Sequence, residues 1–376
     1  MKTGVRPRAF RVGALLAGAA AFGATGPGAE PPCSESSVLT LLGTDTAADR
    51  SLFALSSATP GIETWLVIVD ARDESARLLP DSLAGLRSGA FYGPGPFLAA
   101  TPCGADCFQP VRLGGDGWEP LGGPIAHSST ATAHFTYDRH GSPWIALLSL
   151  SEIAGVVDVT AFRFAAPSWE PRGRLRVQAV GAPAATPDPV HDDAVLVGSG
   201  RFRAGNAPAY WIPSLPAPSG APRGRVVAVA GAAAYLTFDS RLYTSLDGGV
   251  TWFPDSWTPW TGPGALPGTD YWIDLPAATS DASLAALWHD ERHGDAPVTY
   301  LARWTPSRGW AAPVRLGGAA GETSFDHAVS AAADKWLLLG SCRASGRGSV
   351  LDVLLVDPGT TAPRAASLAL ESAWSP

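Results

Sequence analysis

The sequence predicts an all-β protein. From residue 37 onward, short runs rich in Val, Leu, Ala, Phe, Tyr and Trp are broken by Gly, Pro, Asp and Ser at intervals of about ten residues. No segment keeps the 3.6-residue periodicity of an amphipathic helix. Short strands separated by turn residues are typical of consecutive hairpins, so we expect antiparallel sheets throughout.

The apolar runs fall into seven clusters. They cover residues 37–80, 84–122, 128–180, 190–220, 224–256, 272–318 and 325–374. The mean length of about 49 residues is that of one four-stranded blade in a β-propeller. We therefore predict one β-propeller domain over residues 30–376, with seven blades favoured over six. The two ends of the chain are expected to pair and close the ring.

Residues 1–29 are predicted to be a cleavable secretory signal peptide. Four cations precede an apolar run at 12–24 and a small-residue stretch, and no acidic residue is present. The apolar run is shorter than the ~20 residues that span a bilayer, and no later run is longer. We therefore expect no transmembrane segment and a secreted or periplasmic protein.

Charge argues against several partners. Removing a leader with four cations and no anions lowers the formal net charge from -7 to -11. An acidic chain is a poor match for nucleic acid. Lys335 is the one lysine after the leader, and neither a glycine-rich phosphate loop nor a Cys/His zinc spacing occurs. We expect a monomer without metal or cofactor, whose partner is a carbohydrate or an extracellular protein.

The four cysteines suit an oxidising compartment. Cys103 and Cys107 lie in Cys-Gly-Ala-Asp-Cys and are candidates to staple one turn. Cys33 and Cys342 would then join the N-terminal and C-terminal regions. A free-thiol or metal-binding role for Cys103 and Cys107 is the alternative.

One short segment has a recognisable pattern. Residues 245–252 read Ser-Leu-Asp-Gly-Gly-Val-Thr-Trp. This segment resembles the Asp-box, S-x-D-x-G-x-T-W, of BNR and sialidase-like β-propellers at every defined position. The matching residues are Ser245, Asp247, Gly249, Thr251 and Trp252. In such a turn the aspartate accepts backbone hydrogen bonds, glycine permits positive φ, and the tryptophan packs between sheets.

The resemblance implies where the turn lies. In a blade whose four strands form an antiparallel meander, the 1-2 and 3-4 turns share one face of the disc. The 2-3 turn and the 4-1 connection to the next blade share the other. The Asp-box is a 3-4 turn, so it lies away from the usual ligand face. Weaker copies at 115–118 and 307–310 end in Gly-Trp and fall at the late hairpin of their clusters.

The segment after the Asp-box is the most aromatic in the chain. If it is a 4-1 connection, four aromatic residues stand at the ligand face with an aspartate beside them: Trp257, Trp260, Asp270, Tyr271 and Trp272. Aromatic rings stack on sugar rings, and carboxylates accept hydrogen bonds from hydroxyls. The alternative is that these rings cover a gap between blades.

The same face is predicted to carry charged turns. Glu291 and Arg292 follow a strand of the sixth cluster. His289 and His293 flank them at a four-residue spacing, but this spacing presents one face only on a helix and the segment reads as a turn, so a metal site is not favoured. Residues 203–211 resemble 292–300, which suggests the same inter-strand turn in the fourth cluster. On that basis Arg203, Arg343 and Arg292 are candidates for a cationic centre that binds an anionic sugar. A solvated turn is the alternative.

The sequence favours binding over catalysis. The Arg-Ile-Pro segment of sialidases is absent, no tyrosine has the family context, and no Gly-x-Ser-x-Gly elbow occurs, so no catalytic residue is assigned. We expect a non-catalytic scaffold for a carbohydrate or cell-surface glycoconjugate. A sialidase-like hydrolase or lyase with unrecognised catalytic residues and a protein-binding assembly platform remain alternatives. His191-Asp192-Asp193 reads as a charged strand start, with weak cation binding as the alternative.

Overall fold

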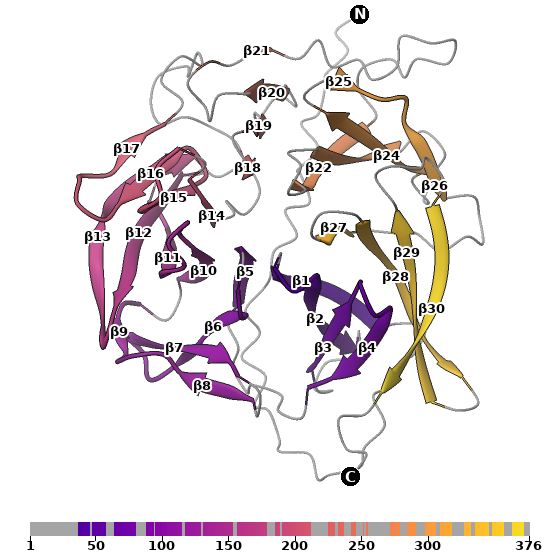
Figure 1. The fold of residues 1–376 in the computed structure, drawn as a ribbon. Coiled ribbons are helices and arrows are strands. Elements are labelled where there is room, and N and C mark those ends of the chain that lie inside the picture. Colours follow the sequence, from indigo (N-terminus) through magenta and orange to yellow (C-terminus); the bar gives the residue numbers. More distant parts are fainter. Residues whose placement is uncertain are drawn as a thin grey trace, which may run out of the picture.

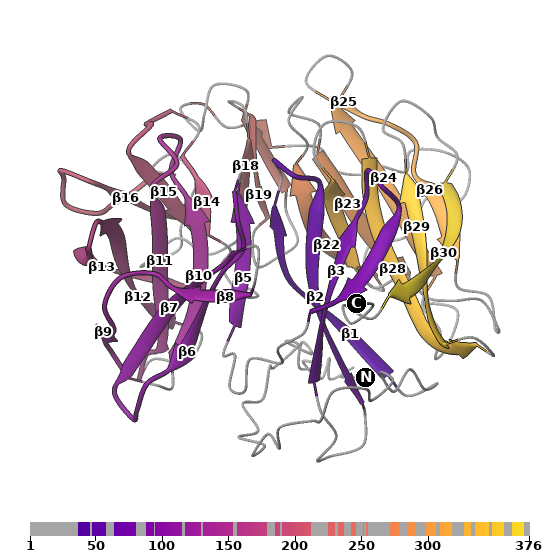
Figure 2. The ribbon, with the colours of Figure 1, turned by 60° about the horizontal axis from the view of Figure 1, so that its bottom comes forward.

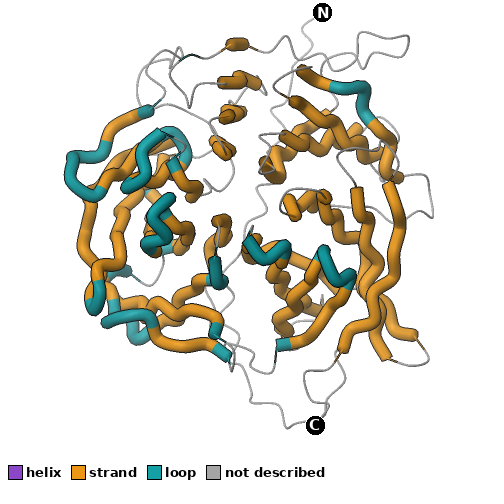
Figure 3. The backbone as a smooth tube through the Cα atoms, viewed as in Figure 1, coloured by secondary structure: helices purple, strands orange, loops and turns teal. Residues whose placement is uncertain are grey.

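The structure is a computed structural model. It describes residues 37–45, 47–57, 64–79, 88–93, 95–114, 117–128, 131–152, 156–178, 185–188, 190–211, 225–229, 232–236, 242–245, 251, 253–254, 271–278, 284–290, 298–305, 309–317, 327–331, 335–345, 348–356 and 363–371. Within these ranges every regular element is a strand (Figure 3). The predicted all-β class is therefore confirmed.

The strands form seven blades around a common centre (Figure 1), and they pair antiparallel within each blade except for the first strand of blade 2, which pairs in parallel with the first strands of blades 1 and 3. Blade 1 holds β1 (Ser37–Asp45), β2 (Arg50–Ser57), β3 (Thr64–Asp70) and β4 (Ser75–Leu78). Blade 2 holds β5 (Ser88–Gly93), β6 (Leu98–Pro102), β7 (Cys107–Leu113) and a fourth strand in two pieces, β8 (Trp118–Pro120) and β9 (Ile125–Ala126). Blade 3 holds β10 (Thr132–Tyr137), β11 (Pro143–Leu150), β12 (Val156–Ala165) and β13 (Ser168–Gln178). Blade 4 holds β14 (Ala185–Pro187), β15 (Ala194–Val197), β16 (Gly200–Arg203) and β17 (Ala209–Tyr210).

The remaining three blades follow in chain order. Blade 5 holds β18 (Arg225–Val229), β19 (Ala232–Leu236), β20 (Leu242–Ser245) and β21 (Phe253–Pro254). Blade 6 holds β22 (Tyr271–Ala278), β23 (Leu284–Asp290), β24 (Val298–Thr305) and a divided fourth strand, β25 (Gly309–Trp310) and β26 (Val314–Gly317). Blade 7 holds β27 (His327–Ala331), β28 (Lys335–Ser345), β29 (Gly348–Val356) and β30 (Pro363–Glu371). The seven blades match the seven predicted clusters in number and order, but β9 and β14 lie outside the predicted bounds of the second and fourth clusters, 84–122 and 190–220.

The innermost strands of blades 1 to 3 join directly. β5 pairs in parallel with β1 on one side and with β10 on the other. This approach needs a glycine, because a Cβ built on Gly43 would lie 2.7 Å from the Cβ of Phe91. The parallel pairing links the blades near the centre of the ring.

Apolar clusters fill the interfaces between blades. The largest joins blades 1 to 3 and includes Phe91, Phe108 and Phe135. A second joins blades 3 and 4 through Trp144, Val195 and other buried residues. The alternation of each strand explains this arrangement, because successive side chains point to opposite neighbouring blades.

The ring closes between blades 7 and 1. β30 pairs in parallel with β4, and Leu351, Val353, Leu355 and Leu368 of blade 7 pack with Phe53, Leu55, Val67, Val69, Ala76 and Leu78 of blade 1. Both views place β30 beside blade 1 (Figures 1 and 2). The expected pairing of the two chain ends needs correction, because the C-terminal strand meets the fourth strand of blade 1. In the described residues, each terminal blade is built from consecutive strands of its own. Cys33 and the side chain of Cys342 lie outside the described residues.

Candidate functional site

The chain order fixes the faces of the disc. Each blade is an antiparallel meander, so the 2-3 turns and 4-1 connections lie on one face, which we call the upper face. The 1-2 and 3-4 turns lie on the opposite face, which we call the lower face.

The Asp-box occupies the predicted 3-4 turn. It joins β20 to β21, whose pairing places Thr244 opposite Phe253. Ser245 is fully buried and Thr251 is exposed. Asp247, Gly249 and Trp252 lie outside the described residues. The two weaker copies also join third and fourth strands, β7 to β8 and β24 to β25. Gly117 in the first of them has a φ of 131°, as a glycine-dependent turn requires.

The aromatic segment lies between two blades in the chain. It runs from β21, the last strand of blade 5, to β22, the first strand of blade 6. Trp257, Trp260 and Asp270 lie outside the described residues. Tyr271 and Trp272 open β22 and pair with Asp290 and His289 at the end of β23. These two aromatic residues therefore stand at the upper end of blade 6.

The three arginines predicted to form one cationic centre do not all lie at the same kind of turn. Glu291 and Arg292 lie outside the described residues but follow directly after β23, so they belong to the 2-3 turn of blade 6. Arg343 lies in β28 opposite Val350, close to the 2-3 turn of blade 7. Arg203 is the last residue of β16 and precedes a 3-4 turn.

The prediction that Arg203 and Arg292 lie in equivalent turns on the same face was wrong. The turn after Arg203 joins the third strand of blade 4 to the fourth, whereas residues 291–297 join the second strand of blade 6 to the third. The two turns therefore lie on opposite faces despite their similar residues. Arg203 pairs instead with Asp193 of the lower face, at 3.5 Å. It is not part of a cationic centre on the upper face.

Buried aspartates hold the 1-2 turns of the lower face, and the sequence analysis missed them. Asp138, fully buried, follows β10. Its Oδ1 accepts hydrogen bonds from the backbone N–H groups of His140 and Ser142, at 3.1 and 2.8 Å. Its Oδ2 accepts bonds from Trp144 Nε1 and Arg163 Nε, at 3.0 and 3.1 Å. The carboxylate is saturated by structural donors.

The same arrangement recurs in blades 1 and 4. Asp45 accepts bonds from the N–H groups of Ala47 and Ala48 and from Arg50. Asp188 accepts bonds from the N–H groups of Val190 and His191 and from Arg201. Each carboxylate pairs with an arginine, which offsets the cost of its burial. The shared signal is an Asp at the end of a first strand with an Arg in the second or third strand.

Neighbouring 1-2 turns are bonded to one another. Asp45 Oδ1 accepts a bond from Gly95 N of blade 2, at 3.2 Å. Tyr137 of blade 3 donates from its hydroxyl to Pro96 O of blade 2, at 2.8 Å, and burial raises the pKa of this phenol. Arg139 of blade 3 contacts Asp192 of blade 4 through its side chain, at 3.0 Å. The lower face of blades 1 to 4 is therefore one connected structure.

His191-Asp192-Asp193 forms part of this structure. His191 contacts Asp188, Asp192 pairs with Arg139, and Asp193 pairs with Arg203. Among the described residues, no group of three or more His, Cys, Asp or Glu is placed to hold a metal ion. The three ionisable side chains of this segment thus contact side chains of opposite charge type in the same and neighbouring blades.

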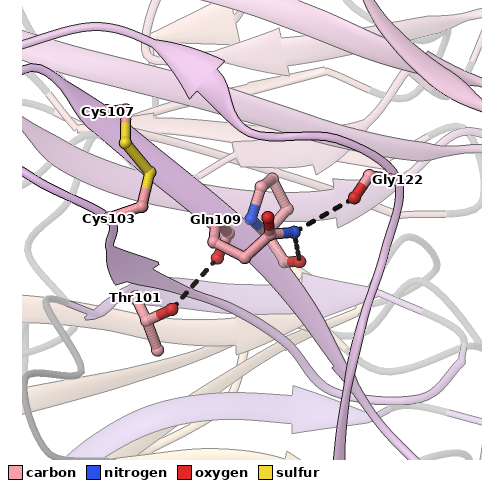
Figure 4. The surroundings of a disulfide bond; sticks show 6 residues. Thr101, Cys103, Cys107, Gln109 and Gly122 are labelled. Carbon is pink, nitrogen blue, oxygen red and sulfur yellow. Dashed lines mark hydrogen bonds between the residues drawn. A yellow bond between two sulfur atoms is a disulfide. The ribbon is translucent and has the colours of Figure 1, made fainter.

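Cys103 and Cys107 form a disulfide in the 2-3 turn of blade 2 (Figure 4). The predicted staple is thus present, and it lies on the upper face. Cys103 N also donates to Cys107 O, at 3.1 Å, and β6 and β7 pair immediately below. Asp106 within the turn accepts a bond from His127 N, at 3.0 Å. The hairpin is therefore held by backbone bonds as well as by the disulfide.

A further polar group lies on the outer strands of blade 3. Asp158 of β12 accepts bonds from Arg174 Nη2 and Arg176 Nε of β13, at 2.8 and 3.2 Å. Burial pushes the pKa of Asp158 upward, but the bonds from Arg176 and Arg174 outweigh it and lower the pKa below its usual value. No helix in the described part of the chain is long and apolar enough to cross a membrane.

These features define a seven-bladed β-propeller. No protein-family model matches the chain, and no curated protein matches it. Among solved structures it is similar to the β-propeller domain of the Trilobed protease from Pyrococcus furiosus, described as having an open velcro topology. The TM-score is 0.50 at 8% identity, and the match covers 88% of this chain and 98% of that one. At this identity the likeness shows the fold alone.

Two other propellers match at lower TM-scores. YCF48 bound to D1 peptide has a TM-score of 0.43 at 14% identity, with 90% of this chain and 84% of that chain covered. The Aleuria aurantia lectin in complex with Fucα1-6GlcNAc has a TM-score of 0.45 at 12% identity, with 91% and 99% covered.

Proposed function

We propose that this protein is an exported, non-catalytic propeller that binds carbohydrate, as a polysaccharide or a cell-surface glycoconjugate, at its upper face. The observation that carries the proposal is the course of the aromatic connection. It leaves β21 and enters β22, and so it belongs to the face that also holds the 2-3 turns. Residues 255–270 include Trp257 and Trp260, and Tyr271 and Trp272 continue the aromatic run into β22.

The chemistry of this connection suits a sugar. Indole and phenol rings bury the apolar face of a pyranose, while Asp270 supplies a carboxylate for its hydroxyls. Glu291 and Arg292, in the 2-3 turn of the same blade, would add polar contacts. The Asp-box resemblance to BNR and sialidase-like propellers supports the same orientation, because that turn lies on the lower face.

The absence of catalysis is part of the proposal. Of the buried carboxylates described in 1-2 turns, Asp45, Asp138 and Asp188 have their oxygens occupied by backbone and arginine donors, so they are not available as acids or bases. Asp49 pairs with Arg72 through Oδ2, at 2.8 Å, and its Oδ1 has no hydrogen-bond partner among the described residues. Export follows from the predicted leader at residues 1–29.

A glycan array with mass spectrometry of the bound sugars tests the proposal. We expect the mature protein to be retained without cleavage. A Trp257→Ala/Trp260→Ala variant should lose binding by about tenfold, because stacking on a ring contributes about 1 kcal/mol or more. Leu150→Ala is the matched control, since Leu150 is 92% exposed beside the 2-3 turn of blade 3 on the same face.

The alternatives give different outcomes. Cleaved sugars would favour a hydrolase or lyase. A folded tryptophan variant that binds as well as the control would remove the aromatic connection from the site. Loss of the folded state in that variant would mean that the rings pack between blades. No retention on any glycan would favour a protein-binding platform.

A further inference from the structure

The outer sheet of blade 3 carries a regular polar array on one face. Ser149, Asp158 and Arg176 are direct cross-strand partners in β11, β12 and β13. Two residues along, Leu147, Thr160 and Arg174 form the next row. Because side chains of directly paired residues point to the same side, these two rows share one face of the sheet.

Burial identifies which face this is. Leu147 belongs to the apolar cluster that joins blade 3 to blades 1 and 2, whereas Val157 and Val159 belong to the cluster toward blade 4. The array therefore lies on the side of blade 3 that faces blade 2, at the outer edge of that apolar cluster. Its hydroxyls are half-buried, while Arg174 and Arg176 have 64% and 54% of their side chains exposed.

The charges in the array do not balance. Two guanidinium groups share the single carboxylate of Asp158, so the group carries a net charge of about +1. The bonds to Asp158 use Nη2 of Arg174 and Nε of Arg176, and each guanidinium has five N–H donors. This positive site stands in a protein of net charge -7.

The outer edge of β13, which carries Arg174 and Arg176, is hydrogen-bonded to blade 4. Tyr210 of blade 4 donates from its hydroxyl to the carbonyl oxygen of Arg176, at 2.6 Å. The backbone that carries the two arginines is thus bonded on one side to β12 and on the other to blade 4.

We infer that Arg174 and Arg176, with Thr160 and Ser149, form a second binding site that takes the anionic groups of an acidic polysaccharide. A carboxylate or sulfate accepts paired N–H bonds from guanidinium groups, and the neighbouring sugar hydroxyls meet Thr160 and Ser149. The spacing suits a polymer, because the array runs along the strands over two rows about 7 Å apart. The inference rests on the proposed function for the ligand type, a glycan, and on blade 3 alone for its location.

The test measures binding of the mature protein to three polymers: polygalacturonate, dextran sulfate and uncharged dextran. Isothermal titration calorimetry at low and high salt gives the affinities. We expect a polyanion to bind, dextran to bind far more weakly, and salt to weaken the polyanion complex. Tighter binding of polygalacturonate than of dextran sulfate would assign a carboxylate ligand, and the reverse a sulfate.

Substitutions test whether the polyanion binds at Arg174 and Arg176. Arg174→Gln/Arg176→Gln should lose at least about tenfold in affinity for the polyanion, because two charge-assisted bonds are removed. Arg139→Gln is the matched control, since Arg139 is 52% exposed and forms an ion pair with Asp192 on the lower face. Asp158→Asn should tighten binding, because it removes the negative charge between the two guanidiniums. If the double variant unfolds with Asp158 left unpaired, the triple variant with Asp158→Asn removes that carboxylate and is used instead.

Equal polyanion affinity in the folded arginine variant and in Arg139→Gln would overturn the inference, as would equal affinity for dextran or no binding to either polyanion. The Trp257→Ala/Trp260→Ala variant separates the two sites. Unchanged polyanion binding in that variant, with loss in the arginine variant, leaves this site standing whatever the glycan array shows for the aromatic connection.

Discussion

The indole N–H of Trp144 donates to the carboxylate of Asp138 at 3.0 Å, in a pair that is almost completely buried. Trp144 belongs to the apolar cluster between blades 3 and 4, and Asp138 closes the 1-2 turn of blade 3. One hydrogen bond therefore couples a turn of the lower face to the packing between two blades.

Replacing Asp138 should be costly. Asp138→Asn keeps the shape of the side chain, but its amide nitrogen cannot accept the bonds from Trp144 and Arg163. It also leaves Arg163, 21% exposed, without its carboxylate. We expect the free energy of unfolding to fall by about 3 kcal/mol. Chemical denaturation measures this, with Asp192→Asn, an exposed ion pair, as a control that should change by under about 1 kcal/mol. Equal losses in the two variants would mean that Asp138 is not a structural centre of the turn.

The seam between blades 7 and 1 should depend on apolar packing. Leu368 is 7% exposed in the apolar cluster at the seam, so Leu368→Ala is expected to cost about 3 kcal/mol. Arg364 pairs with Glu74 across the same seam but is 56% exposed, so Arg364→Gln should cost under about 1 kcal/mol. Equilibrium unfolding of both variants compares the two contributions. The reverse order of losses would place the stability of the seam in its ion pair.

The disulfide should be a local restraint. It closes a short loop in a hairpin that backbone bonds already hold, so Cys103→Ser/Cys107→Ser should lower the free energy of unfolding by about 2 kcal/mol or less. The far-UV and near-UV circular dichroism should stay as in the parent protein. Loss of the near-UV signal would show that the disulfide organises more than the turn.

The ion pairs of Asp158 predict a pH dependence. Burial raises its pKa, and the bonds from Arg176 and Arg174 lower it by more, so the folded value lies below the unfolded one. The ionised carboxylate therefore stabilises the fold above its ordinary pKa of about 4, and this contribution is lost as the pH falls through the lower folded value. We expect the Tm difference between the wild type and Asp158→Asn to be largest above about pH 5 and to shrink on acidification. A difference that stays constant from neutral to acidic pH would contradict this coupling. Asp106→Asn, in an exposed turn, is the control.

The short apolar runs predicted the blades well, because a strand packed between two neighbouring blades is buried on both sides, as β11 and β15 are. The Asp-box predicted its own 3-4 turn because the pattern encodes the backbone geometry of that turn. The resemblance of residues 203–211 to 292–300 gave a wrong prediction for Arg203, because short polar turns on opposite faces use the same Gly, Asn, Asp and Pro residues. β14 and β17 have three and two residues, too few for periodicity to count strands within blade 4.

The buried aspartates were missed for a different physical reason. An Asp in a turn is common on any surface, and only burial distinguishes Asp138 from the exposed Asp192. Burial depends on strands far away in sequence, such as β12, which supplies Arg163. The pairing of Arg174 and Arg176 with Asp158 is likewise a matter of register, which the sequence pattern alone does not specify.

The seam between blades 7 and 1 bears on the order in which the chain assembles. Because every blade is completed before the next begins, a growing chain can assemble them in order, and the circle is finished only when β30 reaches β4. In the described residues neither terminal blade borrows a strand from the other end of the chain, so blades 1 and 7 meet only as neighbours. Closure of the ring therefore depends on a single joint, at which the last strand of the ring to be synthesised meets a blade made near the start.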